Sequence, residues 1–245
     1  MDKLIYVAMS GAKQTLAAQA ANNYNLANVN TTGFKADLSA FQSRTVAGPG
    51  FASRVYATDA TIGYDDTPGV DTNTGNPLDV AVQGQGFIAV QSANGQEGYT
   101  RAGDLHVDPS GVLMTATGNP VVGQDGPISI PPAASITIGA DGTVSVVPSG
   151  QTPVTLATVG RIKLVNPPPA SLQKGTDGLY YTADGTVLPP DASVTLASGV
   201  LEQSNVNIST CLVNMIELSR QFDLQIKSLH AAKQDSASTS KLLGP

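Results

Sequence analysis

The two ends of this chain carry helical patterns, and residues 28–207 between them do not. Residues 4–27 contain Gly11 as their only Gly and no Pro. Apolar residues recur there at helical spacing, which predicts an amphipathic helix. The stripe consists of Ile5, Met9, Ala12, Leu16, Ala20 and Leu26. A chain with helices only at its extremities has few folds open to it, because both helices must find partners far away in the sequence.

The second predicted helix begins near the carboxyl end, with Asn207 or Ser209 as its N-cap. Apolar residues three and four positions apart form a stripe on one face. They are Ile208, Leu212, Met215, Leu218, Phe222, Ile226 and Leu229. The polar face carries Arg220 and the i,i+4 pair Asp223 and Lys227, whose opposite charges can support the helix.

A turn is expected directly after the first helix. Asn28, Asn30, Thr31, Thr32 and Gly33 follow it, and short polar side chains and Gly favour the left-handed backbone of a helix C-terminus. Residues 35–77 then show no sustained period and several Gly and Pro breakers, so an extended arm or linker is predicted there.

From Leu78 the pattern changes to short strands. Residues 78–83 alternate in polarity, 87–91 continue as a strand after a Gly-rich turn, and 159–165 form the clearest late strand. Asp-Gly turn signals recur between β-branched runs. A mostly antiparallel β domain, sandwich-like or barrel-like, is therefore predicted over 78–200.

Composition excludes several classes of function. Only 13% of residues are charged, while 25 Gly and 16 Pro suit a turn-rich β protein. The net charge of −6 and the lack of a basic patch argue against nucleic acid. Cys211 is the only Cys, and we expect it to be a small buried residue. No segment is apolar enough to span a membrane, and no cleaved signal peptide is expected.

The sequence also carries only weak signals for catalytic, cofactor-binding or metal-binding residues. His106 and His230 lack a second His at metal-ligand spacing. The Gly84 and Gly86 pair lacks the third Gly and the helix of a dinucleotide loop. Asp104 and Asp108 do not have the spacing of a calcium loop. We therefore expect no catalytic, cofactor-binding or metal-binding residues, and no enzyme.

Motifs at both ends and in the middle resemble the flagellar rod, hook and hook-associated axial proteins. The turn motif is NLAN at 25–28 followed by Thr31 and GF at 33–34. The middle carries LDVAVQGQGF at 78–87, YTRAG at 99–103 and DPSG at 108–111, and the carboxyl end carries LEQSNV at 201–206, MI at 215–216 and RQFD at 220–223. The opening residues and the length resemble the proximal rod branch most, and one departure is Tyr24, where the family usually carries Asn.

The resemblance implies an α+β protein whose terminal helices pair as a coiled-coil-like inner domain, over residues 1–34 and 201–245. It implies a structural subunit of the proximal rod, a hollow drive shaft that transmits torque across the periplasm. Its partners would be other rod subunits, copies of itself, and the flagellar type III export apparatus. The alternatives are a distal rod or hook-type axial protein, and a secreted β-rich glycan-binding module or enzyme.

Particular residues receive roles in this interpretation. The assembly residues of the first helix are Ile5, Met9, Leu16 and Leu26, and those of the second are the apolar stripe from Ile208 to Leu229. The turn motif consists of Asn25, Asn28, Thr31, Gly33 and Phe34. Two helices in contact leave much of each stripe in water, so we expect the ends to order when several subunits pack.

Overall fold

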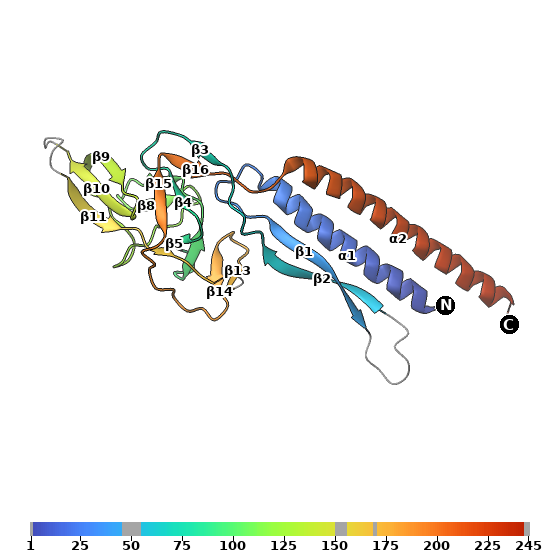
Figure 1. The fold of residues 1–245 in the computed structure, drawn as a ribbon. Helices are drawn as coiled ribbons and strands as arrows, with labels where there is room; N and C mark the ends of the chain where they lie inside the picture. Colours follow the sequence, from blue (N-terminus) through green and yellow to red (C-terminus); the bar gives the residue numbers. More distant parts are fainter. Residues whose placement is uncertain (1, 46–54, 150–155, 169–170, 243–245) are drawn as a thin grey trace. The chain divides into compact units, whose positions relative to one another are not determined.

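The computed structural model describes residues 2–45, 55–149, 156–168 and 171–242 (Figure 1). The chain divides into two compact units. The first, which we call the helical unit, comprises residues 1–29, 36–65 and 206–245. The second, the β unit, comprises residues 30–35 and 66–205. The short segment 30–35, which directly follows the first helix in sequence, therefore belongs to the β unit.

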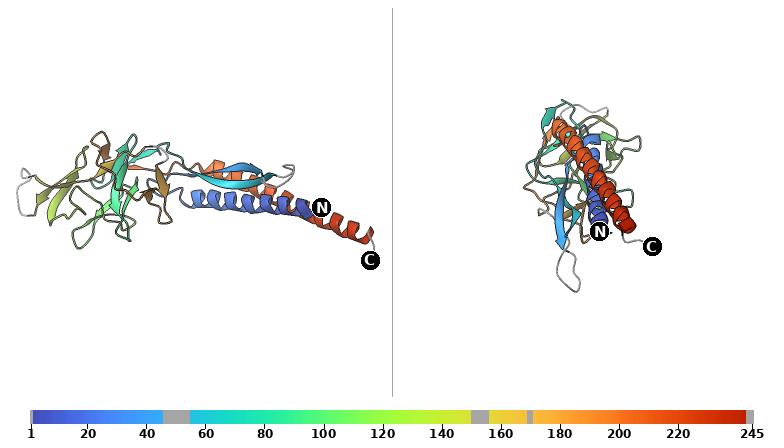
Figure 2. Two further views of the ribbon diagram at one scale, coloured as in Figure 1. Left: turned by 90° about the horizontal axis from the view of Figure 1, so that it is seen from below. Right: turned by 90° about the vertical axis from the view of Figure 1, so that its right-hand side faces the viewer.

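Two helices pack against each other in the helical unit, running antiparallel (Figures 1 and 2). They are α1 (Asp2–Ala27) and α2 (Ile208–Leu242). Asn207 caps α2, because its side-chain oxygen accepts from the Thr210 N–H at 3.1 Å. At the end of α1, the side chain and the main chain of Asn28 both donate to the Tyr24 carbonyl. Both predicted helices are thus confirmed.

A two-stranded antiparallel ribbon lies beside α1 in the same unit (Figures 1 and 2). It is formed by β1 (Asp37–Thr45) and β2 (Val55–Tyr64), with an irregularity between Leu38 and Ser39. The arm predicted over 35–77 is therefore a paired ribbon in its first part, while residues 66–77 belong to the β unit. Periodicity does not reveal the ribbon, because a two-stranded element beside one helix needs no strict alternation.

The β unit contains the remaining strands, all in antiparallel pairs. In chain order these are β3 (Asp71–Asn73), β4 (Val80–Gln83), β5 (Phe87–Gln91), β6 (Glu97–Thr100), β7 (Leu105–Val107), β8 (Leu113–Thr115), β9 (Ala133–Ile138), β10 (Thr143–Pro148), β11 (Ala157–Arg161), β12 (Leu164–Val165), β13 (Leu172–Lys174), β14 (Tyr180–Thr182), β15 (Thr195–Ser198) and β16 (Val200–Glu202). The predicted α+β class with mostly antiparallel strands is confirmed.

Several small sheets share one core in this unit. The largest has five strands in the order β12-β5-β6-β14-β13, and a three-stranded sheet has the order β11-β10-β9. β15 pairs with β4, β16 with β3, and β7 with β8. Fully buried side chains from several sheets meet in the core, among them Val80, Ile88, Leu113, Val121 and Val144.

Asp side chains hold the tight turns that the sequence indicated. Between β7 and β8, Asp108 accepts from the N–H groups of Ser110 and Val112, both at 2.9 Å. Between β9 and β10, Asp141 accepts from the Thr143 N–H at 3.1 Å. Hydrogen bonds from the Ser110 and Thr143 hydroxyls, and then these N–H bonds, favour the charged carboxylate and hold the pKa of Asp108 and Asp141 below the ordinary value. The single late strand predicted over 159–165 is two strands, β11 and β12, which join different sheets.

In the part of the chain that the structure describes, no helix is both long and apolar enough to cross a membrane.

One carboxylate in the β unit is poorly accommodated. The Oδ1 atom of Asp104 is buried and accepts no hydrogen bond from any described residue. Asp104 forms an isolated antiparallel bridge with Asp79, a second carboxylate. Burial is the main cause that raises the pKa of Asp104, and the Asp79 charge adds to it. Asp104 therefore opposes folding whenever it is ionised.

We predict that Asp104→Asn raises the free energy of unfolding at pH 7 by about 1 kcal/mol, because an uncompensated buried charge is removed. The folded state binds this proton more tightly than the unfolded state. The advantage of the variant should therefore shrink as the pH falls through the raised pKa toward 3.8. Urea unfolding across this pH range, followed by circular dichroism, measures both effects. The control Asp184→Asn removes an exposed carboxylate and should change little; equal gains in both variants would contradict the explanation.

Candidate assembly site

The turn that follows α1 is locked into the β unit at Gly33. This residue has a φ of +66°, and its N–H donates to the Glu202 carbonyl at 2.8 Å. A Cβ atom on Gly33 would lie 2.2 Å from the carbonyl carbon of Arg101. The next residue, Phe34, donates its N–H to Thr31 and accepts from the Asn205 N–H at 3.3 Å. Backbone conformation and space both require Gly here.

Three charged side chains meet directly beside this turn. The Lys35 ammonium lies 2.7 Å from Oε1 of Glu202, and Nε of Arg101 lies 2.9 Å from Oε2 of the same carboxylate. Their side chains are 0%, 1% and 2% exposed for Lys35, Arg101 and Glu202. We call these three residues the ion triad. With two cations and one carboxylate, the triad brings a net positive charge into the interior.

Main-chain groups complete the surroundings of the triad. Lys35 Nζ donates to the Thr67 carbonyl, the Gly69 N–H donates to Glu202, and Arg101 Nη2 donates to the carbonyls of Val82 and Gly84. The contact between Arg101 Nε and Glu202 Oε2 is an ion pair rather than an aligned hydrogen bond. Burial lowers the pKa of Lys35, and its hydrogen bond with Glu202 opposes that effect.

A third cation, Lys174, covers the turn from the side of β13. Lys174 Nζ lies 3.8 Å from the centre of the Phe34 ring, a cation–π contact, and donates to the Lys35 carbonyl at 3.1 Å. Phe34 is buried at 8% exposure. Phe34 is thus held by packing and charge as well as by its main chain.

Asn25 has a different role, inside the helical unit. Its side-chain Nδ2 donates to the Asp37 carbonyl at 3.0 Å, and its Oδ1 accepts from the Asp37 N–H at 2.9 Å. This amide therefore imitates a strand residue and docks the first residue of β1 onto α1. Of the turn motif, Asn25 fixes the ribbon, Asn28 caps α1, and Thr31, Gly33 and Phe34 form the locked turn.

The structure separates the predicted stripe of α1 into two environments. Met9 and Leu16 are 53% and 49% exposed, whereas Ile5 and Leu26 are half-buried. On α2, Ile208 and Leu212 are 49% and 42% exposed. The other members of that stripe are half-buried, namely Met215, Leu218, Phe222, Ile226 and Leu229. The polar-face residues Arg220, Asp223 and Lys227 are all exposed.

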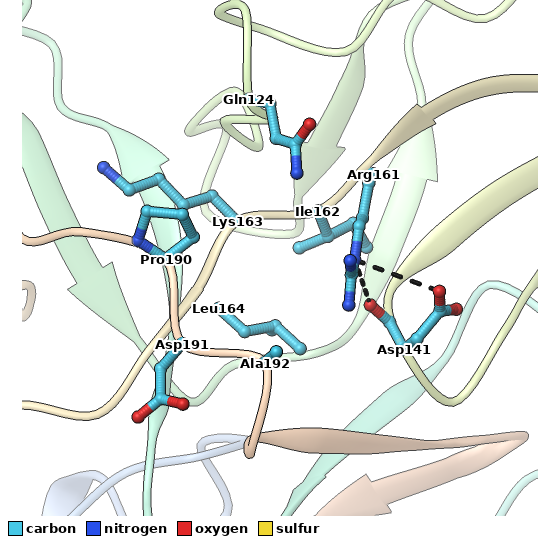
Figure 3. A pocket seen from close by; sticks show the side chains of 9 residues that line it. All are labelled: Gln124, Asp141, Arg161, Ile162, Lys163, Leu164, Pro190, Asp191 and Ala192. Carbon is cyan, nitrogen blue, oxygen red and sulfur yellow. Dashed lines mark hydrogen bonds and ion pairs between the residues drawn. The ribbon is translucent and has the colours of Figure 1, made fainter.

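The structure gives little support for catalysis. A hollow of about 210 Å³ in the β unit has Ile162, Leu164 and Ala192 in its lining (Figure 3). Arg161 at its rim donates to the Asp141 carbonyl at 2.7 Å. His106 and His230 are exposed. Among the described residues, no group of His, Cys, Asp and Glu side chains has the arrangement of a metal site.

Sequence reasoning missed the ion triad. The expected roles fell on neighbours of Lys35, Arg101 and Glu202 in the motifs, although all three lie in or beside quoted motifs. A usable signal existed, because charged residues make up only 13% of the chain, and a charge inside an otherwise apolar or small-residue motif is unusual. The sequence could not show that these three charged residues contact one another.

Comparison with known proteins shows the family of this chain. Three family models match: "Flagella basal body rod protein" at residues 5–35, "Flagellar hook protein FlgE/F/G D1 domain" at 81–146, and "Flagellar basal body rod FlgEFG protein C-terminal" at 197–242. Each matched segment contributes one member of the triad. The flagellar basal-body rod protein FlgF of Escherichia coli is 43% identical over 249 residues, covering 99% of both chains. The chain belongs to the flagellar basal-body rod protein family.

Other relatives agree with this membership. FlgF of Salmonella typhimurium is 44% identical, again over 99% of both chains. FlgG of Bacillus subtilis is 32% identical over 93% of this chain and 94% of its own length. This rod-family chain is therefore a structural subunit of the flagellar basal-body rod and not an enzyme.

We predict that Gly33→Ala destabilises this rod-family protein far more than Gly185→Ala does. Both glycines have a φ of +66°, but a Cβ on Gly185 would meet nothing within 4 Å. The control should cost about 1 kcal/mol for left-handed backbone. Gly33→Ala must in addition displace the Arg101 main chain, and should at least double that loss. Urea unfolding measures both; similar losses would show that space at Gly33 is not limiting.

We further predict that Glu202→Gln lowers the free energy of unfolding by about 3–5 kcal/mol, because two buried cations lose their carboxylate. The matched control is Asp141→Asn. Its partner Arg161 lies 3.9 Å away, with side chains 57% and 38% exposed, so the loss should stay below about 1 kcal/mol. Thermal and urea unfolding distinguish the two variants. If Glu202→Gln left the free energy of unfolding unchanged, the triad would not contribute to stability.

Proposed function

We propose that this subunit belongs to the proximal rod and assembles through α1 and α2 into a hollow shaft that transmits torque across the periplasm. The observation that carries this proposal is the distribution of exposed apolar side chains. Fourteen large hydrophobic residues in the described part of the chain are exposed, and ten of them lie on the two helices. Those on α1 are Tyr6, Val7, Met9, Leu16 and Tyr24, and those on α2 are Ile208, Leu212, Val213, Ile216 and Leu224.

Burial of these side chains would supply the energy of assembly. Each is roughly half exposed, and covering the remainder contributes on the order of 1 kcal/mol per residue. Ten such residues per subunit give about 10 kcal/mol before the cost of association. A head-to-tail lattice of identical contacts does not close on itself, which suits a stiff filament. The partners would be other rod subunits and further copies of this chain.

Helix pairing of the coiled-coil type is part of the proposal. Seven of the buried and half-buried residues of α2 repeat with alternating spacings of four and three, the pattern of a coiled-coil seam. They are Cys211, Met215, Leu218, Phe222, Gln225, Leu229 and Ala232. The paired helices would form the inner layer of the tube and the β unit a sandwich-like outer body. The core supports that description, since strands of the five-stranded and three-stranded sheets both contribute to it.

Export and order of folding complete the proposal. The subunit would reach the periplasm through the flagellar type III apparatus, as the family resemblance implies. Helices that keep large apolar residues in water gain stability only when neighbours cover them. The ends would therefore pass the export channel unfolded and order on assembly. The identity to FlgF supports the proximal position over the distal one, because the quoted FlgG relative matches less closely.

Substitution of exposed helix residues tests this function. Leu16→Asp and Ile216→Asp each place a carboxylate where a neighbouring subunit would pack, at a cost of several kcal/mol per contact. Both should abolish swimming and lower the amount of subunit in isolated basal bodies at least tenfold. Val187→Asp, at a β-unit residue 64% exposed, is the matched control and should swim normally. Normal swimming of both helix variants at normal expression would reject assembly through these faces.

A further inference from the structure

The side chains that the two helices bury most fully are small. The buried residues near the middle of α1 are small: Ala8, Ala12, Thr15 and Ala18. Met9 and Leu16, on the same helix, remain exposed. On α2 the buried residues are Cys211 and Ala232, while the larger Met215, Leu218 and Phe222 are half-buried. A face of uniformly small residues allows close approach, but it gives little information about how far one helix may slide along the other.

One steric contact interrupts this uniform face. A Cβ atom built on Gly11 would lie 2.8 Å from Cδ, Nε2 and Oε1 of Gln225 together. The Gln225 amide therefore occupies the space beside Gly11, and a larger residue at position 11 would have to displace this end of the Gln225 side chain. The Gly11 carbonyl also accepts from the Thr15 hydroxyl at 3.0 Å. A Gly inside a helix costs about 1 kcal/mol relative to Ala, so its presence here requires a compensating contact.

A polar contact about three turns further along α1 acts in the same direction. Asn22 Nδ2 donates to the Cys211 carbonyl at 2.9 Å. The contact of Gly11 with Gln225 pairs the N-terminal part of α1 with the later part of α2. The contact of Asn22 with Cys211 pairs the C-terminal part of α1 with the start of α2. Any slide of one helix along the other removes both. Polar residues in a helix seam are known to fix register in this way, at some cost in stability.

We propose that Gly11, Gln225 and Asn22 are positioning residues that set the longitudinal register of α1 against α2. This inference rests on the proposed assembly through the helices and adds what determines their alignment. One set of exposed apolar residues lies on α1 and the other on α2, so the register decides how far apart the two sets lie along the helix pair. A neighbouring subunit can match both sets only at one register. The three residues would thereby set which subunit contacts form.

A size exchange tests the contact between Gly11 and Gln225. Gly11→Leu fills the place of the amide and should reduce the swimming-ring diameter at least about threefold. Gln225→Ala clears space on α2, so the double variant Gly11→Leu/Gln225→Ala should recover at least half of the wild-type diameter. Unimpaired swimming of Gly11→Leu would overturn the proposal. Loss without recovery in the double variant would also overturn it, because a merely structural glycine is not rescued by a smaller partner.

The single native cysteine provides a direct measurement of register. Asn22→Cys replaces one of the three positioning residues and places a second thiol beside residue 211, so Gly11 and Gln225 hold the register in this variant. Ala17→Cys places a thiol on the exposed side of α1. In basal bodies treated with oxidant, the intramolecular disulfide to Cys211 should form at least five times more with Asn22→Cys. Adding Gly11→Leu should remove that preference, and adding Gln225→Ala as well should restore it. Equal yields from positions 17 and 22 would contradict the assigned register.

These outcomes separate the register from the proposed function itself. If Leu16→Asp and Ile216→Asp swim normally, assembly through the helix faces fails, whatever the disulfide pattern. If those variants fail to swim but the size exchange does not rescue, the faces are used and the register is set by other residues.

Discussion

A carboxylate held between two cations in a dry interior is the interaction on which this structure depends. Glu202 can be buried only because Lys35 and Arg101 neutralise it, and neither cation could be buried without Glu202. The three residues come from the turn after α1, from the segment after β6, and from the last strand of the β unit. The ends of the β unit are thereby made part of its core.

Main-chain hydrogen bonds beside the ion triad also join the first and last segments of the β unit. Gly33 and Phe34 bond Glu202 and Asn205 through their main chains. The two points where the chain leaves the β unit toward α1 and α2 are therefore fixed next to each other. α1 ends and α2 begins close in sequence to these two points, although the helices, at 2–27 and 208–242, are about 180 residues apart in sequence. The entropy lost in bringing the ends of so long a loop together is compensated by folding of the β unit and not by the helix contact itself.

Local patterns in the sequence predicted the elements well and their partners poorly. β5 is found where the apolar run at 87–91 indicated a strand, and α2 begins directly after its predicted cap Asn207. The ion triad was missed because its members lie 66 and 101 positions apart (35 to 101, 101 to 202), and one sequence holds no record of which charges meet. The same limit hid the division of 159–165 between two sheets, which only the packing of other strands decides.

Hydrophobic periodicity also selected the larger residues of α1, whereas the structure buries the smaller ones. A pattern search weights Met9 and Leu16 above Ala8 and Ala18, because side-chain size dominates any measure of apolarity. The helix contact reverses that weighting, since small side chains let two helices approach closely, and the buried residues of α2, Cys211 and Ala232, are small as well. The predicted stripe of α1 is therefore divided: part remains in water, and the residues that pack are those with least apolar surface to bury.

The assignment of residues 30–35 to the β unit has a practical consequence for dissecting the molecule. The natural boundary of the β unit lies before Asn30 and not at the end of the recognisable turn motif. A fragment that begins at residue 36 would leave Arg101 and Glu202 without Lys35 and would lack the Phe34 ring that Lys174 covers. A fragment of the β unit suited to isolated study must therefore retain six residues that a helix-based partition would discard.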